Sequence, residues 1–100
     1  MNRQLPIAED DLAAFCTRHH VQRLSLFGSV LKGTARPNSD VDLLVEFEGG
    51  EAPGLLALSA MEDELSTLMK GRRVDIRTPR DLSRHFRAEV VRTAELQYAR

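Results

Sequence analysis

Hydrophobic and polar positions alternate most regularly over residues 40–47, and this alternation predicts a strand. Every second residue is apolar, and this row consists of Val41, Leu43, Val45 and Phe47. The opposite row consists of Asp40, Asp42, Leu44 and Glu46. Successive side chains of a strand point to opposite faces, so one face should enter a core while the other carries two carboxylates. Shorter apolar runs predict two further strands over residues 21–27 and 73–77.

Helical spacing of apolar residues predicts three longer helices, over residues 8–20, 55–70 and 82–99. The expected buried stripe of the second helix is Leu55, Leu58, Met61, Leu65, Leu68 and Met69. That of the last helix is Phe86, Val90, Val91, Ala94 and Tyr98. A short helix is expected from residue 29 to about 33, before a turn over residues 34–39. The predicted fold class is therefore α/β, a mixed sheet flanked by helices.

Composition narrows the classes of protein to which the chain can belong. Its 100 residues are 42% hydrophobic and 29% charged, which suits one compact core and predicts a single domain over residues 1–100. The 14 Lys and Arg nearly balance the 15 Asp and Glu, so bulk binding of nucleic acid is not expected. With one cysteine, no apolar signal core and no run long enough for a membrane, we expect a cytoplasmic protein.

Three carboxylates stand beside strongly apolar neighbours in the predicted strands. Asp40 and Asp42 are two residues apart on an extended chain, so their side chains point the same way from Cα atoms roughly 6.5 to 7 Å apart. Carboxylates converging from this separation can hold a pair of divalent cations, and oxygen ligands suit Mg²⁺ or Mn²⁺. Asp75 would add a third carboxylate if its strand pairs beside the first in register. Two aspartates at this spacing are also common as solvated loop charges, so the interpretation depends on the strand context.

A second motif precedes the carboxylate pair by ten residues. Gly28 and Ser29 end a predicted strand where a helix could begin. A glycine there lets a phosphate approach the backbone, while helix N–H groups and the serine hydroxyl can donate to its oxygens. The alternative interpretation is an ordinary strand-to-helix turn with a serine N-cap. A phosphate-binding turn beside a carboxylate pair is the minimum that transfer of a nucleotidyl group requires.

The segment FGSVLKGTARPNSDVDLLVEF resembles the G-S-x10-D-x-D signature of the DNA polymerase beta-like nucleotidyltransferases. Within that superfamily it is most similar to the minimal nucleotidyltransferases, the MntA-type antitoxins paired with HEPN-domain toxins. VDIRTP resembles the later strand that holds the third carboxylate, and the likeness runs from about residue 21 to residue 98. Leu31 and Lys32 replace the small residue and arginine common after Gly-Ser, and Lys32 keeps the positive charge.

The resemblance implies a polymerase beta-like core and a role for each motif residue. Gly28 and Ser29 would bind the triphosphate of the incoming nucleotide. Arg36, in the loop between the motifs, would neutralise phosphate, although a solvated loop arginine is an equal alternative. Two Mg²⁺ or Mn²⁺ ions would be held by carboxylates. The metal-binding and catalytic residues would be Asp40, Asp42 and Asp75.

The resemblance also implies a reaction, in which AMP passes from ATP to a hydroxyl group. The expected acceptor is a tyrosine of a cognate HEPN-type toxin, so that AMPylation would silence the toxin and the chain would act as antitoxin. Two other classes stay open. An enzyme for a small molecule, such as an aminoglycoside nucleotidyltransferase, usually carries an additional helical domain. A non-catalytic module that neutralises its partner by binding would tolerate a damaged carboxylate, but all three are present here.

Overall fold

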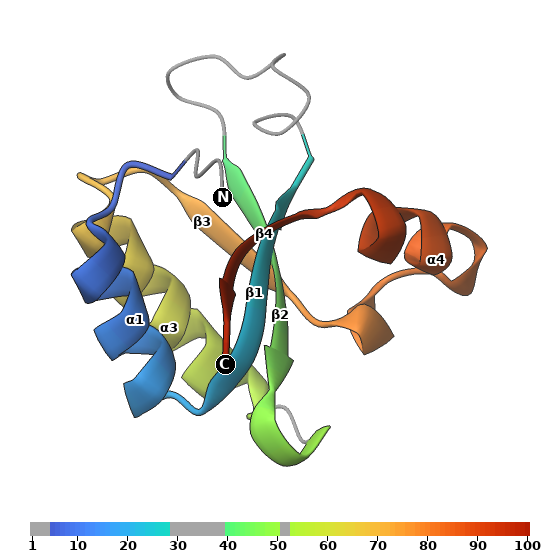
Figure 1. Ribbon diagram of the computed structural model, residues 1–100, viewed down its shortest axis with the longest axis horizontal. Coiled ribbons are helices and arrows are strands. Elements are labelled where there is room, and N and C mark those ends of the chain that lie inside the picture. Colours follow the sequence, from blue (N-terminus) through green and yellow to red (C-terminus); the bar gives the residue numbers. More distant parts are fainter. Residues whose placement is uncertain (1–4, 29–39, 51–52) are drawn as a thin grey trace.

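Four strands form one mixed sheet in the part of the chain that the computed structural model describes (Figure 1). The described residues are 5–28, 40–50 and 53–100. The strands are β1 (Val21–Phe27), β2 (Val41–Phe47), β3 (Val74–Arg77) and β4 (Glu95–Ala99). Their spatial order is β3-β2-β1-β4, with β2 antiparallel to β1 but parallel to β3, and β4 antiparallel to β1. The three strands predicted from apolar patterning are confirmed, whereas the short helix and turn expected over residues 29–39 lie outside the described residues.

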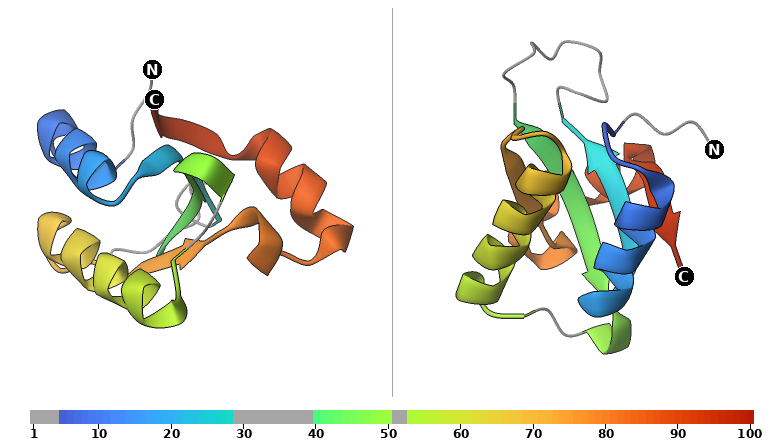
Figure 2. Two further views of the ribbon diagram at one scale, coloured as in Figure 1. Left: turned by 90° about the horizontal axis from the view of Figure 1, so that it is seen from below. Right: turned by 90° about the vertical axis from the view of Figure 1, so that its left-hand side faces the viewer.

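Helices cover the two faces of the sheet unequally. Figure 2 shows α1 (Glu9–Arg18) and α3 (Leu55–Leu68) together on one face and α4 (Arg84–Thr93) beyond the other. Two short 3-10 turns, η1 (Glu48–Gly50) and η2 (Pro79–Asp81), follow β2 and β3. The fold is thus the predicted mixed sheet flanked by helices. Within the described ranges, no helix combines the length and apolar character that crossing a bilayer needs.

The core lies between the sheet and the layer formed by α1 and α3. The alternation in β2 sends Leu43 and Val45 into it, and both are fully buried. Phe15 from α1 and Leu65 from α3 meet them there, also without exposed surface. Cys16 belongs to the same core, and burial raises the pKa of its thiol to about 12. The thiol therefore stays protonated and serves packing rather than chemistry.

The last predicted element is wrong in its second half. The sequence predicts one helix over residues 82–99, but α4 ends at Thr93 and residues 95–99 form β4. Ala94 takes an extended conformation (φ −61°, ψ 139°) that stops the helix. Tyr98, expected on a buried helical face, instead pairs with Leu24 of β1 and packs against the core from a strand. The backbone hydrogen bonds offered by the edge of β1 outweigh the local helical spacing.

Two predicted buried stripes are only partly buried. Leu55 is 85% exposed, because α3 is longer than the strand it packs against. Its 14 residues span about 21 Å, whereas the 4 residues of β3 span about 13 Å, so the first turn of the helix extends past the strand.

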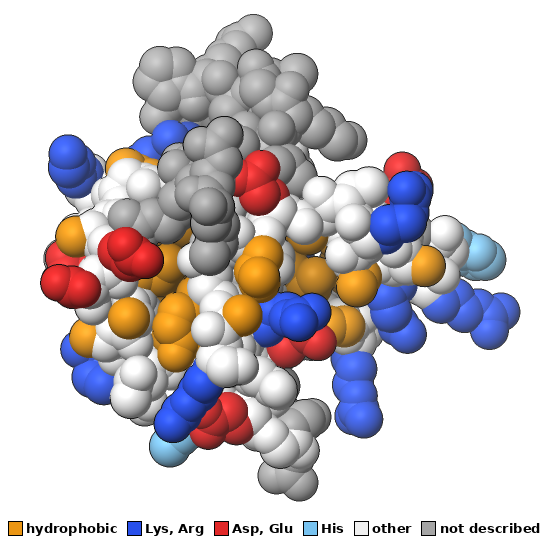
Figure 3. Space-filling model, in the orientation of Figure 1, with side chains coloured by type: hydrophobic (Ala, Val, Ile, Leu, Met, Phe, Trp, Pro, Cys, Tyr) orange, Lys and Arg blue, Asp and Glu red, His pale blue; other side chains and the backbone are white. Residues whose placement is uncertain are grey.

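In α4, the predicted burial holds only in part: Val91 is 47% exposed, Val90 is half-buried, and the side chain of Phe86 lies outside the described part. Basic side chains protrude on the right of Figure 3, where this helix lies.

Candidate functional site

The pairing of β2 with β3 brings two of the predicted carboxylates side by side. Asp42 and Asp75 are direct partners in this parallel pair, so their side chains leave the same face of the sheet. Asp40 precedes β2 by one residue, two positions before Asp42. The side chain of Asp75 is 33% exposed and that of Asp40 is 48% exposed, while Asp42 is half-buried. The three carboxylates therefore share one open face at the start of β2 and β3.

The surroundings of Asp42 shift the pKa of its carboxyl. Burial raises the pKa of its carboxyl above the ordinary 3.8, the neighbouring Asp75 and Asp40 raise this pKa further, and Arg77 lowers it. Like charges in a partly desolvated place disfavour ionisation, and a cation bound among them would remove that penalty. An all-carboxylate donor set is the chemistry that Mg²⁺ and Mn²⁺ prefer, so the residues present suit these ions.

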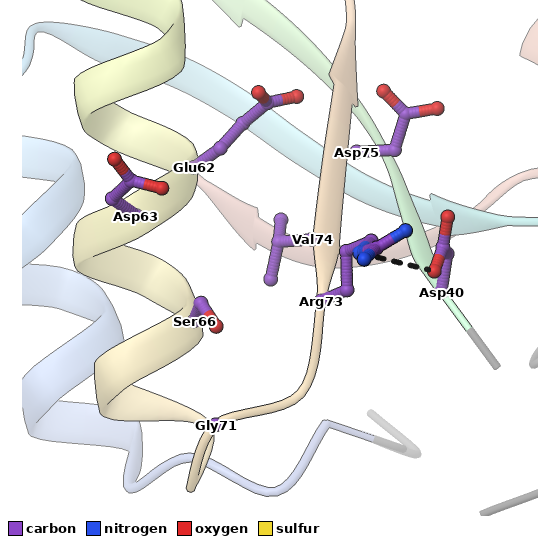
Figure 4. A pocket seen from close by; sticks show the side chains of 8 residues that line it. All are labelled: Asp40, Glu62, Asp63, Ser66, Gly71, Arg73, Val74 and Asp75. Atoms are coloured by element: carbon purple, nitrogen blue, oxygen red, sulfur yellow. Dashed lines mark ion pairs between the residues drawn. The ribbon is translucent and has the colours of Figure 1, made fainter. Parts of the chain in front are cut away.

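Two arginines contact the outer carboxylates. Arg77 Nη2 lies 3.1 Å from Asp75 Oδ2, and Arg73 Nε lies 4.0 Å from Asp40 Oδ1 (Figure 4). As they are placed, no three acidic, histidine or cysteine side chains among the described residues surround a point suited to a metal ion. A cation would thus compete with the arginines for these oxygens. The sequence analysis did not single out Arg77, although its place two residues after Asp75 on the same strand face was a usable signal.

Gly28 directly follows β1 and lies against Asp42. The last residue of β1, Phe27, is the strand partner of Asp42, and Gly28 follows with a positive φ of 83°. A Cβ atom at Gly28 would stand 2.2 Å from Asp42 Oδ2, which is closer than any real contact. A glycine is therefore required here by both conformation and space. Its predicted role toward phosphate stays a prediction, and Ser29 and Arg36 lie outside the described residues.

A cavity of about 510 Å³ opens beside the carboxylates, at the outer edge of β3 (Figure 4). Its lining consists of Asp40, Glu62, Asp63, Ser66, Gly71, Arg73, Val74 and Asp75. A second cavity of about 400 Å³ has Glu62 and Asp75 in its wall as well, together with Leu55, Leu58, Ser59, Ile76, Arg77 and Asp81. Glu62 is a residue that the sequence analysis missed. It lies in a run of acidic residues on α3, and nothing in the sequence distinguishes it from its neighbours.

Known proteins resemble this chain in sequence and in structure. Residues 12–97 match the family described as nucleotidyltransferase domain. The protein adenylyltransferase MntA of Thermococcus cleftensis is 44% identical over 59 residues, which are 59% of this chain and 57% of that protein. The chain thus matches less than two thirds of the length of this curated relative.

Solved structures show the same arrangement of elements. One, of a protein assigned as a minimal nucleotidyltransferase, is 39% identical with a TM-score of 0.68, over 90% of this chain and 87% of that one. A crystal structure of a toxin–antitoxin with AMP-PNP is 22% identical with a TM-score of 0.75, over 94% of this chain and 75% of that one. At that lower identity, the second likeness concerns the fold alone.

Proposed function

The chain belongs to the nucleotidyltransferase domain family and is homologous to MntA-type protein adenylyltransferases, and from this premise we propose that it transfers AMP from ATP to a hydroxyl group of a partner protein. The observation that carries the proposal is the register of β2 and β3, in which Asp75 is the direct partner of Asp42. Asp40 stands on the same face, and Gly28 lies directly against Asp42. A family likeness without this register would leave the carboxylates apart.

The roles proposed for the carboxylates are those that the family likeness implies, and the shared face of Asp40, Asp42 and Asp75 supports them. Asp40 and Asp42 would hold two Mg²⁺ or Mn²⁺ ions, and Asp75 would complete one of the two metal sites. When bound, the ions would supply charge that offsets the α phosphate and the pyrophosphate leaving group, and they would lower the pKa of the attacking hydroxyl. Asp75 helps to remove the proton as the hydroxyl oxygen forms its bond to the α phosphorus. The bond from that phosphorus to the bridging oxygen breaks, and pyrophosphate leaves with the electron pair.

The nucleotide side of the site rests on the turn after β1. We propose that Gly28 and Ser29 hold the triphosphate of ATP and that Arg36 neutralises part of its charge. The support is the tight contact between Gly28 and Asp42, because the turn and the carboxylates occupy one place. A nucleotide held by this turn would bring its α phosphate to the metal ligands.

The proposed acceptor is a tyrosine hydroxyl of a cognate HEPN-type toxin, which makes the chain an antitoxin. The homologous MntA is a protein adenylyltransferase, and the similar fold occurs in a toxin–antitoxin crystallised with the ATP analogue AMP-PNP. We propose that this chain shares the adenylyltransferase activity of the first protein and the toxin–antitoxin pairing of the second.

The test is to incubate the chain with the candidate HEPN partner, Mg²⁺ and ATP, and to measure the mass of the intact partner. We expect a gain of one or more AMP units with the wild-type chain. Asp42→Asn keeps nearly the same shape but removes one ligand charge, so transfer should fall by at least roughly a hundredfold. Asp63→Asn is the matched control, because Asp63 lines the same cavity from α3 and is not a partner in the sheet. It should transfer normally.

Two outcomes would overturn the proposal. If Asp42→Asn silences the toxin fully and no mass is added by either protein, the chain acts by binding alone. If AMP appears on an aminoglycoside rather than on protein, the chain is a small-molecule transferase.

A further inference from the structure

β3 is poorly held for a strand that carries a functional side chain. It has only 4 residues and lies at the edge of the sheet, with β2 on one side and, within the described part of the chain, no strand on the other. Arg73 directs its carbonyl oxygen toward β2, where it accepts from the Val41 N–H at 2.8 Å. Because neighbouring residues of a strand direct their backbone groups to opposite sides, Asp75 directs its N–H toward β2 and Ile76 directs its N–H outward.

The outward N–H of Ile76 has a partner on α3. It donates to Glu62 Oε2 at 2.7 Å, a short hydrogen bond to a half-buried carboxylate. In Figure 4, Glu62 extends toward β3 from α3 on one side of the strand, and Asp75 projects on the other side. The Ile76 nitrogen belongs to the peptide group that begins at the Asp75 carbonyl, so the hydrogen bond fixes the backbone directly after Asp75.

We infer that Glu62 is a positioning residue for Asp75, which it holds in register with Asp42 by anchoring the edge of β3 to α3. This inference rests on the proposed function, since it concerns the third metal-binding carboxylate. Glu62 acts through the strand and need not touch metal or substrate. Its place in the walls of both cavities, each time together with Asp75, is the geometric result of bridging α3 to this edge.

What matters in this role is reach rather than charge. The hydrogen bond needs an oxygen at the distance that a glutamate side chain provides from α3. Glu62→Gln keeps that length and an acceptor oxygen while losing the charge. Glu62→Asp keeps the charge but is one methylene shorter, which withdraws its oxygens from the Ile76 N–H. The two variants therefore separate anchoring from electrostatic attraction of a cation.

The experiment measures binding of Mn²⁺ alone by calorimetric titration, at a temperature well below unfolding, and hydrogen exchange at the Ile76 amide. We expect Glu62→Gln to bind Mn²⁺ within roughly twofold of wild type, and its Ile76 amide to exchange somewhat faster than in wild type but more slowly than in Glu62→Asp. Glu62→Asp should bind Mn²⁺ roughly tenfold more weakly, as is usual when a group that orients a metal ligand is lost, and its Ile76 amide should exchange faster. Asp63→Asn removes a charge from the same cavity and should change neither.

Two results would overturn the inference. In the first, Glu62→Asp binds Mn²⁺ as wild type does with an equally slow Ile76 amide. In the second, Glu62→Gln is the weak variant and Glu62→Asp is normal, which would make Glu62 an electrostatic contributor. Failure of the proposed function looks different: the wild-type chain itself would then bind no Mn²⁺ or transfer no AMP, and exchange at Ile76 would still report whether the anchor exists.

Discussion

The two ends of β2 place acidic side chains in opposite surroundings. Before the strand, Asp40 and Asp42 meet Asp75, and these neighbouring carboxylates add to the rise in the pKa of Asp42. After the strand, Glu48 is paired with Arg100 and approached by His20, whose Nδ1 lies 3.8 Å from Glu48 Oε2. One end gathers three carboxylates, although Arg73 and Arg77 pair with two of them, while the other end joins opposite charges.

A glycine with positive φ accompanies each end, and the two glycines differ in the same way. Gly28 (φ 83°) has Asp42 against the position of its missing Cβ, whereas Gly49 (φ 74°) has no atom of the described residues within 4 Å of that position. The end that joins opposite charges is thus also open and tolerant of change. The end that gathers carboxylates is crowded, and strain of this kind is expected at the proposed site.

The largest effect should come from adding one methyl group at the crowded end. Gly28→Ala places a Cβ 2.2 Å from Asp42 Oδ2 at a φ of 83°, so overlap adds to backbone strain and should cost about 3 kcal/mol of unfolding free energy. Gly49→Ala meets only the strain and should cost about 1 kcal/mol. Urea unfolding of both variants measures the difference. Equal losses would mean that Asp42 moves away freely and that the crowding has no consequence.

A bound divalent cation should increase the unfolding free energy through the carboxylates at the crowded end of β2. With Mn²⁺ at about 100 times its dissociation constant, the wild-type chain should gain about 2.7 kcal/mol of unfolding free energy, since only the folded state brings the carboxylates together. Asp40→Asn combined with Asp42→Asn should abolish this gain, while Glu48→Gln should leave it intact. Thermal unfolding with and without Mn²⁺ gives the answer. A gain that survives in the double variant would locate the metal elsewhere.

A smaller effect concerns pH in the metal-free protein. The pKa of Asp42 is raised above 3.8 in the folded state. The contribution of this group to folding stability is therefore fully present below about pH 3.8. Its contribution is lost as pH rises through the folded-state pKa. Asp42→Asn cannot titrate, so the variant should gain on the wild type between about pH 4 and neutrality. Unfolding free energies measured across this range should diverge, and parallel profiles would contradict the crowding of charge.

The smallest effect belongs to the end with opposite charges. Glu48→Gln removes the ion pair with Arg100, whose side chain is 54% exposed. Solvent screens such a pair, so the loss should be below about 1 kcal/mol and should shrink further at high salt. Chemical unfolding at two salt concentrations tests it. A larger, salt-independent loss would show that this end is not the tolerant one.

The sequence correctly predicted those elements whose apolar periodicity matches the burial of their side chains in the fold. The alternation of β2 corresponds to a strand with one face in the core, and Asp42 stood on the opposite face as expected. Its register with Asp75 could only be stated as a condition, because no local pattern determines which strands pair. The same limitation hid β4: Tyr98 satisfied helical spacing, and only the distant edge of β1 makes its segment a strand.

The place of the candidate site's residues was predictable where they form a motif, and unpredictable where a contact is made through the backbone. Asp40 and Asp42 can be recognised in the sequence from their spacing and their strand context. Glu62 donates nothing and pairs with no side chain in this role: it accepts a hydrogen bond from a main-chain N–H, which every residue except proline possesses. Such a contact leaves no trace in residue type, so only the folded chain reveals it.

The position of β1 between β2 and β4 also determines when the sheet can be completed. One side of β1 pairs with a strand made soon afterwards, whereas the other side waits for residues 95–99, the last strand along the chain. During synthesis, β1 therefore spends most of the elongation time with one hydrogen-bonding edge open, and an open edge is where a second chain can add. Slowing translation ahead of residue 95 should therefore raise the aggregated fraction.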